Sequence, residues 1–250
     1  MRGIQRWWQE ITGLVLPVGC AGCGLPRSIL CEWCRAVLSG GEPRRVRPSP
    51  EPAGLPHVHA AAPYGGEVRA VLLAHKERGA MALARPLGDA LAGAIRACSG
   101  ARGGLLLVPI PSARRAVAAR GHDPTRRVAR AAAAVLRRGG RPARVVAVLR
   151  QRRAVADQSG LTAPQRLGNL AGALAVPESA AGLLGGGSTG REAASVVLVD
   201  DLMTTGASLV EGARAVTEAG GRVAGAAVVA APLTAFRPRA VRGVARGAGI

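Results

Sequence analysis

The sequence contains very few aromatic residues. Phenylalanine and tyrosine each occur once and tryptophan three times, which makes up 2% of the chain. Proteins that bind single-stranded nucleic acid without sequence preference stack bases on aromatic side chains, so this scarcity argues against a stacking platform. Apolar runs are also short, because charges or glycines interrupt each one before the ~18 residues that a membrane helix needs. No membrane span is expected.

Acidic residues are also scarce. The chain has 34 basic and 15 acidic residues, a formal net charge of +19, and Lys76 is its only lysine. Residues 114–166 contain fourteen arginines but only Asp123 and Asp157 as acids. Such a basic field favours polyanions, either nucleic acid or phosphorylated metabolites. An arginine-rich coding bias on a solvated surface explains the same excess, and the abundance of alanine and glycine supports it.

Length and composition predict one main domain with a small appendage, since 250 residues with 48% hydrophobic content can bury one substantial core. Residues 1–16 have the spacing of an amphipathic helix. The apolar stretch before Cys20 follows Glu10 and precedes further cysteines, which favours an internal segment over a secretory signal, and a cytoplasmic protein is expected. The predicted divisions are a helix and four-cysteine module at 1–38, a Pro/Gly-rich linker at 39–57, the main domain at 58–235 and a disordered basic tail at 236–250.

Four cysteines form two CxxC pairs separated by seven residues, Cys20 with Cys23 and Cys31 with Cys34. Each pair lets two thiolates approach one ion from a tight turn, and two such turns complete a tetrahedral site. The spacing predicts a structural zinc site, with disulfides or a redox CxxC as the alternatives. A closed site of four thiolates leaves no open coordination position, so its metal organises the fold and performs no chemistry.

Beyond residue 58, helical and strand patterns alternate. Helical spacing covers 66–77, 81–97, 124–138 and 206–219, and continuous apolar runs typical of buried strands cover 104–111, 144–149, 195–199 and 222–230. Buried strands separated by helices predict a parallel sheet covered on both faces. The predicted fold class is therefore α/β, a doubly wound parallel sheet with a small N-terminal zinc-binding module.

The segment SVVLVDDLMTTGAS, residues 195–208, joins a predicted strand to a helix through two carboxylates, two threonines and a glycine. Ligands of open parallel sheets bind beyond the carboxyl ends of the strands. The turn Thr204–Ser208 offers a helix N-terminus and three hydroxyls to a phosphate. Asp200 and Asp201 would repel that phosphate unless ribose hydroxyls, reinforced by Mg²⁺, lay between them. The pattern predicts a ribose phosphate ligand; aspartates that cap a helix are the alternative.

These residues resemble a known family. VVLVDDLMTTGAS is similar to the phosphoribosyl diphosphate signature of type I phosphoribosyltransferases, and together with the four cysteines it resembles the ComF family of competence-associated proteins. Further similar segments are HKERG at 75–79, VPIPSARR at 108–115, ARGHD at 119–123 and the run at 149–174. The resemblance extends from residue 14 to about residue 232 and implies a type I phosphoribosyltransferase-like fold.

The resemblance implies roles for individual residues. It implies that the catalytic residues are Asp200, Asp201 and Arg120, and that ribose 5-phosphate is bound by Asp200, Asp201, Thr204, Thr205, Gly206, Ala207 and Ser208. It implies a pyrophosphate loop with Pro109, Pro111, Arg114 and Arg115, and a flexible closing loop with Arg150, Gln158, Arg166 and Asn169. The family's RGFN reads RGHD at 120–123, which puts base contacts there in doubt.

Three functions are compatible with these features. The resemblance implies a protein that binds phosphoribosyl diphosphate with Mg²⁺ and takes part in DNA uptake, with single-stranded DNA and DNA-uptake proteins as partners. The second is a metabolic phosphoribosyltransferase for nucleobase salvage or amine transfer. The third is a regulator that senses the sugar phosphate and binds nucleic acid without turnover. In a transferase, cationic groups and magnesium would stabilise the departing pyrophosphate.

The basic stretch 114–166 generates a first prediction. If it binds polyanions, affinity for single-stranded DNA falls steeply between low and physiological salt, because binding releases condensed counterions. Charge reversal at Arg137 and Arg138 weakens binding further. Fluorescence anisotropy with a labelled oligonucleotide measures both effects, and undetectable binding at low salt would favour coding bias.

Overall fold

The computed structural model describes residues 19–100, 103–153, 155, 160, 162–184 and 194–236. The strands are β1 (Arg44–Val46), β2 (Val58–Pro63), β3 (Leu105–Pro109), β4 (Ala143–Val145), β5 (Arg150–Gln151), β6 (Leu174–Ala175), β7 (Ser195–Leu202) and β8 (Val223–Ala231). The α-helices are α2 (Glu32–Ser39), α3 (Gly66–Glu77), α4 (Ala84–Cys98), α5 (Arg114–Arg120), α6 (Pro124–Arg138), α7 (Ala163–Leu170), α8 (Glu178–Ala181) and α9 (Ala207–Glu218). Two 3₁₀ turns are η1 (Met81–Leu83) and η2 (Leu233–Ala235).

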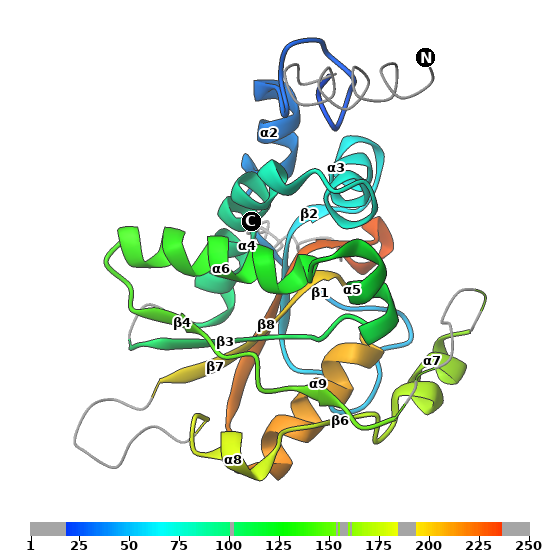
Figure 1. Cartoon of the computed structure of the whole chain (residues 1–250), viewed down its shortest axis with the longest axis vertical. Coiled ribbons are helices and arrows are strands. Elements are labelled where there is room, and N and C mark those ends of the chain that lie inside the picture. The colour runs from blue at the N-terminus through cyan, green and yellow to red at the C-terminus, as the bar shows by residue number, and fades with distance from the viewer. Residues whose placement is uncertain are drawn as a thin grey trace, which may run out of the picture.

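A six-stranded sheet with the order β1-β2-β8-β7-β3-β4 forms the centre of the molecule (Figure 1). Strand β1 runs antiparallel to β2, and every other neighbouring pair is parallel. Figure 1 shows α3, α4 and α6 on one side of the sheet and α9 on the other. The prediction of an α/β fold with a mostly parallel sheet is therefore confirmed.

The connections that follow β3 and β7 lead toward opposite edges of the sheet. From β3 the chain crosses by α6 to β4 on one side, whereas from β7 it crosses by α9 to β8 on the other side. Two adjacent parallel strands whose connections leave on opposite faces open a crevice at their carboxyl ends, where ligands of such sheets bind. The segments that follow β3 and β7 therefore meet at one edge of the sheet.

Two apolar clusters fill the spaces on the two faces. The predicted helical stripe of Leu83, Leu87, Leu91 and Ile95 is buried in the cluster under α3, α4 and α6. The other cluster packs Leu209, Ala215 and Val216 of α9 against the opposite face. Successive strand residues alternate between the two, with Val197 in the first and Leu198 in the second.

The four-cysteine segment belongs to the first of these clusters. Cys20, Cys34 and Leu38 are buried among the same residues as Val71 of α3 and Leu91 of α4. Arg35 of α2 also forms an ion pair with Asp89 of α4, with 4.0 Å between nitrogen and oxygen. The segment thus shares the core of the main domain.

Three segments differ from their sequence-based boundaries. The predicted linker 39–57 contributes β1, whose Val46 is buried beside β2. The strand expected at 144–149 ends at Val145; the Val146 N–H still donates to the Leu107 carbonyl, and the apolar residues that follow pack in the second cluster. The strand expected to end at Val199 continues to Leu202, because β8 pairs with Asp200 and Leu202.

Two sequence-based predictions concern the ends of the chain. The amphipathic helix predicted at 1–16 lies outside the described residues, as do residues 237–250 of the predicted tail. The structure describes the first residue of the predicted tail, Phe236. The centre of its ring lies 5.8 Å from the guanidinium carbon of Arg44.

The crossing of α4 and α6 generates a prediction. A Cβ on Gly88 would lie 2.4 Å from the Cβ of Ala131, so the two helices approach too closely for a side chain. Gly88→Ala is expected to lower the free energy of unfolding by roughly 1–3 kcal/mol through overpacking, although alanine favours helix.

Gly168 in α7 provides the matched control, since a Cβ there meets nothing within 4 Å. Gly168→Ala is expected to be neutral or to stabilise by roughly 0.5–1 kcal/mol. Urea denaturation of both variants measures the difference, and equal stabilities would contradict the close crossing.

Candidate functional site

Asp200 and Asp201 lie directly before Leu202, the last residue of β7, at the carboxyl edge of the sheet. The alternation of the strand places them on opposite faces. Asp201 is buried and continues the series of Val197 and Val199 toward α3, whereas Asp200 is half-buried. The backbone N–H of Asp201 donates to Oδ1 of Asp200 at 2.8 Å, which fixes the orientation of that carboxylate.

Lys76, near the end of α3, reaches this pair of carboxylates. Its Nζ lies 2.9 Å from Oδ2 of Asp201. Burial disfavours the charged ammonium, but the charge and hydrogen bond of Asp201 outweigh this and raise the pKa of Lys76. Burial, and next the charge of Asp201, raise the pKa of the Asp200 carboxyl well above its ordinary value, while Lys76 opposes that rise. One lysine thus only partly compensates two carboxylates, which leaves room for a further cation or for hydroxyl donors.

The loop Thr204–Ser208 follows directly and begins α9. The Met203 N–H donates to the Ala230 carbonyl at 3.0 Å, and the Ala207 N–H to Oγ1 of Thr205 at 3.5 Å. Gly206 has a φ of +79°, and a Cβ on it would lie 2.8 Å from Cδ1 of Leu55. Glycine is therefore required by the turn and by the packing of Leu55, whether or not a phosphate binds.

The predicted pyrophosphate loop lies beside this loop. Pro109 ends β3 next to Val199, and the Ile110 N–H donates to the Val199 carbonyl at 2.9 Å. Pro111 is half-buried, Arg115 is exposed and Arg114 is the first residue of α5. The sheet therefore brings the segments after β3 and β7 together.

Arg120, predicted as catalytic, forms a two-point ion pair. Its Nε and one terminal nitrogen each donate to the Glu77 carboxylate at 2.9 Å. Glu77 follows Lys76 directly, so the end of α3 is bound on one side by Asp201 and on the other by Arg120. In this arrangement Arg120 orients the end of the helix that carries Lys76.

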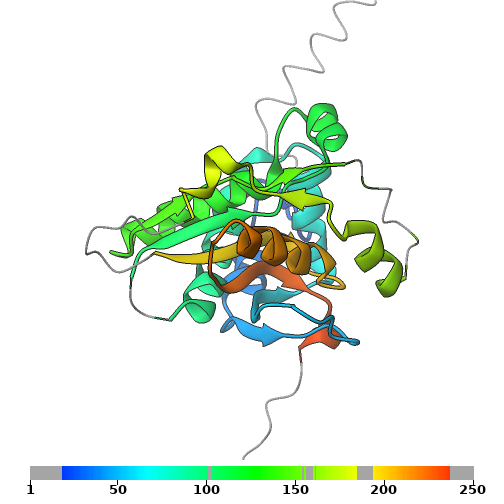
Figure 2. The ribbon, with the colours of Figure 1, turned by 90° about the horizontal axis from the view of Figure 1, so that it is seen from below.

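The predicted flexible loop is anchored at its base. Strand β5 pairs with β6, and the Arg150 guanidinium donates to the Ala147 and Leu149 carbonyls. One terminal nitrogen of Arg166 in α7 donates to Oγ1 of Thr204 at 3.4 Å. Gln158 lies outside the described residues. Helix α7 stands away from the sheet in both views (Figures 1 and 2), yet its Leu170 packs in one cluster with Ala207.

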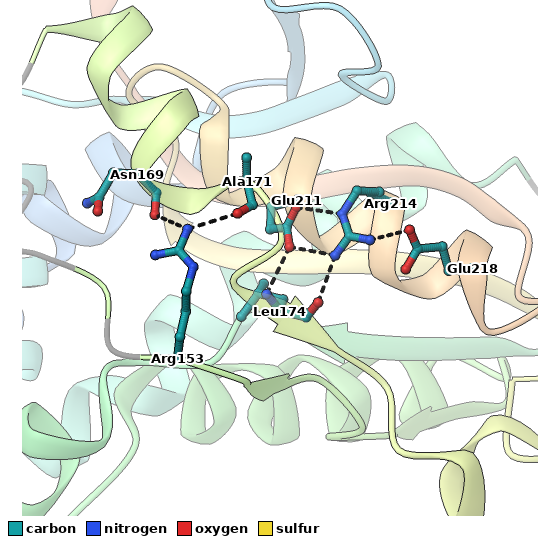
Figure 3. Close-up of polar contacts among 7 residues, drawn as sticks. All are labelled: Arg153, Asn169, Ala171, Leu174, Glu211, Arg214 and Glu218. Carbon is teal, nitrogen blue, oxygen red and sulfur yellow. Dashed lines mark hydrogen bonds and ion pairs between the residues drawn. The ribbon is translucent and has the colours of Figure 1, made fainter.

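A polar network joins this segment to α9 (Figure 3). Glu211 is buried, and its carboxylate accepts from the Leu174 N–H at 2.8 Å and from Arg214 at 2.7 Å. Arg214 also donates to the Leu174 carbonyl at 2.8 Å and pairs with Glu218. Burial opposes ionisation of Glu211, but the hydrogen bonds of Arg214 and Leu174 outweigh it and lower the pKa.

An arginine also binds backbone carbonyls at the end of α7. Arg153 donates to the carbonyl oxygens of Asn169 and Ala171, at 2.9 and 2.8 Å (Figure 3). Arg153 thus ties the two ends of the predicted closing segment together, and Leu174, just after the segment, is bound to Glu211 and Arg214 of α9.

Sequence reasoning did not identify Lys76 or Glu211 as parts of this site. For Lys76 the available signal was its identity as the single lysine among many arginines. For Glu211 it was the spacing of Ala207, Glu211 and Ala215, which puts a carboxylate in the buried stripe of a helix. A buried acid in such a stripe requires a partner, and the structure supplies Arg214.

The four predicted metal ligands lie together. The sulfur atoms of Cys20, Cys23, Cys31 and Cys34 are all within 4.8 Å of one another and could hold a metal ion. Cys31 is 3.6 Å from both Cys20 and Cys23 between sulfurs, and these cysteines are free thiols. A cluster at this spacing fits tetrahedral thiolate coordination and leaves the disulfide alternative without a bonded pair.

Backbone N–H groups favour a thiolate at Cys20, whereas burial and the neighbouring sulfurs raise the pKa of the Cys34 thiol. Burial opposes ionisation of Cys20, but backbone N–H donors of Cys23, Cys31 and Gly22 outweigh it and lower the pKa of the thiol to about 6. A Cβ on Gly22 would lie 2.6 Å from the sulfur of Cys34. Only glycine lets the first turn approach the second this closely.

A scan against protein-family models and a search of curated proteins found no significant match to this chain. Among the described residues, no helix has the length and apolar character needed to cross a membrane.

The cysteine cluster generates a prediction. Cys31→Ser removes the ligand at the centre of the cluster and is expected to abolish metal binding and lower the melting temperature, because metal binding and folding of such sites are coupled. Elemental analysis of purified protein is expected to find about one zinc ion per chain.

Cys98→Ser is the matched control, because that thiol lies apart from the cluster and donates only to the Ile95 carbonyl, a bond that serine can also make. Equal metal content in the Cys31 variant and the parent, or two native disulfides by mass spectrometry, would contradict the assignment.

Proposed function

We propose that the protein binds phosphoribosyl diphosphate with Mg²⁺ at the carboxyl edge of the sheet. The proposal rests on one observation. Asp200 and Asp201 lie just before the loop 204–208, at the crevice between β3 and β7, and Lys76 pairs with Asp201 there. A sugar phosphate needs a phosphate cradle and, a few ångströms away, acceptors for its hydroxyls. This edge offers both in one continuous segment.

The resemblance implies a role for each residue, and the positions of these residues are compatible with the roles. The loop Thr204–Ser208 would take the 5′-phosphate, with hydroxyl donors and the N-terminus of α9. Asp200 would accept the ribose hydroxyls, with its carboxylate already oriented by the Asp201 N–H. The segment after β3, with Arg115, would face the diphosphate. Arg166 of α7, already within 3.4 Å of Thr204, would close over the ligand.

The charge balance supports a magnesium-bound ligand. Burial, and next the charge of Asp201, raise the pKa of Asp200 against the opposing charge of Lys76, and a divalent cation would restore the ionised form of the pair. Bound there with the diphosphate, Mg²⁺ would neutralise charge on the departing pyrophosphate if the protein is a transferase. Lys76 holds Asp201 in place at the same time.

We also propose that the cysteine cluster binds structural zinc and that the protein acts in DNA uptake, as the resemblance to the ComF family implies. Four sulfurs in a closed group, buried in the main core, suit a metal that stabilises the fold. A metabolic phosphoribosyltransferase would use the same sugar phosphate site with a base or an amine as acceptor. A pyrophosphate-release assay with a panel of bases and amines distinguishes the two.

The proposed ligand generates a prediction. Asp200→Asn with Asp201→Asn removes charged acceptors, each worth roughly 1.5–3 kcal/mol in a charge-assisted hydrogen bond, and leaves the phosphate loop intact. Affinity for phosphoribosyl diphosphate in the presence of magnesium is expected to fall at least about tenfold, while weak binding of inorganic phosphate persists. Isothermal titration calorimetry measures both.

Thr204→Ala with Thr205→Ala tests the other half of the site. It removes two hydroxyl donors without the backbone strain that a side chain at Gly206 would introduce, so it is a cleaner probe than Gly206→Val. Ribose 5-phosphate is expected to bind this double variant more weakly than the parent. Unchanged affinity in both double variants would show that the sugar phosphate binds elsewhere.

A further inference from the structure

A second basic cleft lies between α4, α5 and α6, away from the carboxyl edge of the sheet. Its charged rim comes from Arg85 at the start of α4 and from Arg126, Arg127 and Arg130 in the first half of α6. All four arginines are exposed. The cleft has a volume of about 780 Å³, large enough for a nucleotide-sized ligand, and it shares no lining residue with the loop 204–208 or with the aspartate pair.

The four arginines, here called the arginine quartet, have no anionic partners within the described part of the chain. None of their guanidinium groups forms a hydrogen bond or an ion pair there. The one acidic residue in the described lining is Asp123, and its carboxylate accepts from the Arg126 N–H at 3.0 Å as the cap of α6. Other arginines of this chain, in contrast, bind carboxylates or backbone carbonyls, as Arg120 and Arg153 do.

The three arginines of the quartet that lie in α6 occupy positions where positive charge destabilises a helix. A helix N-terminus carries partial positive charge and favours acidic residues, but beyond the cap Asp123 the first turn of α6 contains no acidic residue and includes Arg126 and Arg127. Arg126 and Arg130 are like charges four positions apart, a spacing that destabilises a helix. Residues that break local rules without a compensating contact in the free protein are typical of binding sites.

One residue that lines the cleft has a polar atom without a hydrogen-bond partner. His122 lines the cleft and is 7% exposed, and its Nε2 is buried with no hydrogen-bond partner. Its ring packs edge-on against that of His75, with 5.9 Å between ring centroids. A buried polar atom without a partner is rare, and Nε2 of the adjacent His75 is also unpaired, so the hydrogen bonding beside the cleft is incomplete in the free protein.

From these observations we infer that the cleft binds a compact oligophosphate, carried either by free inorganic polyphosphate or by a nucleoside triphosphate. Such a ligand concentrates several negative charges within the span of one cleft, so it compensates the arginine quartet and the helix N-terminus together. Arginine is suited to this task because its planar fork binds phosphate oxygens in pairs. This site is independent of the proposed sugar phosphate site.

The test uses the full-length protein at physiological salt, with inorganic tripolyphosphate and ATP as separate probes. Arg126→Ala with Arg130→Ala is expected to weaken binding of both probes at least about tenfold, while the affinity for ribose 5-phosphate stays unchanged. Because the substitution relieves repulsion at the start of α6, it is also expected to raise the melting temperature of the free protein by about 1–3 °C. Tighter binding of ATP than of tripolyphosphate would identify a nucleotide as the source of the phosphates.

Arg222→Ala is the matched control, since this exposed arginine lies just before β8, outside the basic stretch 114–166, and does not line the cleft. It is expected to leave the binding of both probes unchanged. Two results would overturn the inference. One is equal loss of binding in the control and the double variant, with single-stranded DNA the tighter ligand, which would indicate a diffuse nucleic-acid surface. The other is tripolyphosphate binding that is lost in Thr204→Ala with Thr205→Ala instead, which would assign it to the sheet edge.

Discussion

The hydrogen bonding of β3 to β7 is the constraint on which the candidate site depends. These strands are adjacent in the sheet, although β4 and the segment 150–184 lie between them in the chain. Their pairing continues past the end of β3, where the Ile110 N–H donates to the Val199 carbonyl. Because the connections of the two strands then leave on opposite faces, the carboxyl edge stays open and receives the side chains of both following segments.

The ion pairs at the end of α3 fix the position of Lys76 relative to the two carboxylates. Lys76 and Glu77 end the helix, and they are held by Asp201 from the sheet and by Arg120 from α5. On the other face, Glu211 and Arg214 tie Leu174 to α9. The two carboxylates and the loop 204–208 are thus supported from both layers, as a site that must keep its geometry requires.

Much of this was predictable from local sequence. The strand 195–199, the helix 124–138 and the two CxxC pairs each carry their signal within a few residues, since apolar period and ligand spacing are local properties. The salt bridge of Lys76 with Asp201 joins residues 125 positions apart, so only the assembled sheet reveals it. The true end of β7 was missed for a related reason: whether Asp200 and Leu202 remain in the strand depends on β8, which supplies their partners. The pairing of Arg120 with Glu77 likewise depends on how α3 and α5 meet.

The burial of Cys20, Cys34 and Leu38 in the same cluster as Val71 and Leu91 has a consequence for how the molecule unfolds. Since the described residues form no separate core beneath the cysteines, the cysteine segment and the helical layer over the sheet are expected to form one cooperative unit. Cys23 is the exposed member of the four, so oxidants and chelators reach the cluster from solvent. Damage that begins at this exposed sulfur is therefore expected to destabilise α2 together with α3, the helix that delivers Lys76 to the carboxylates.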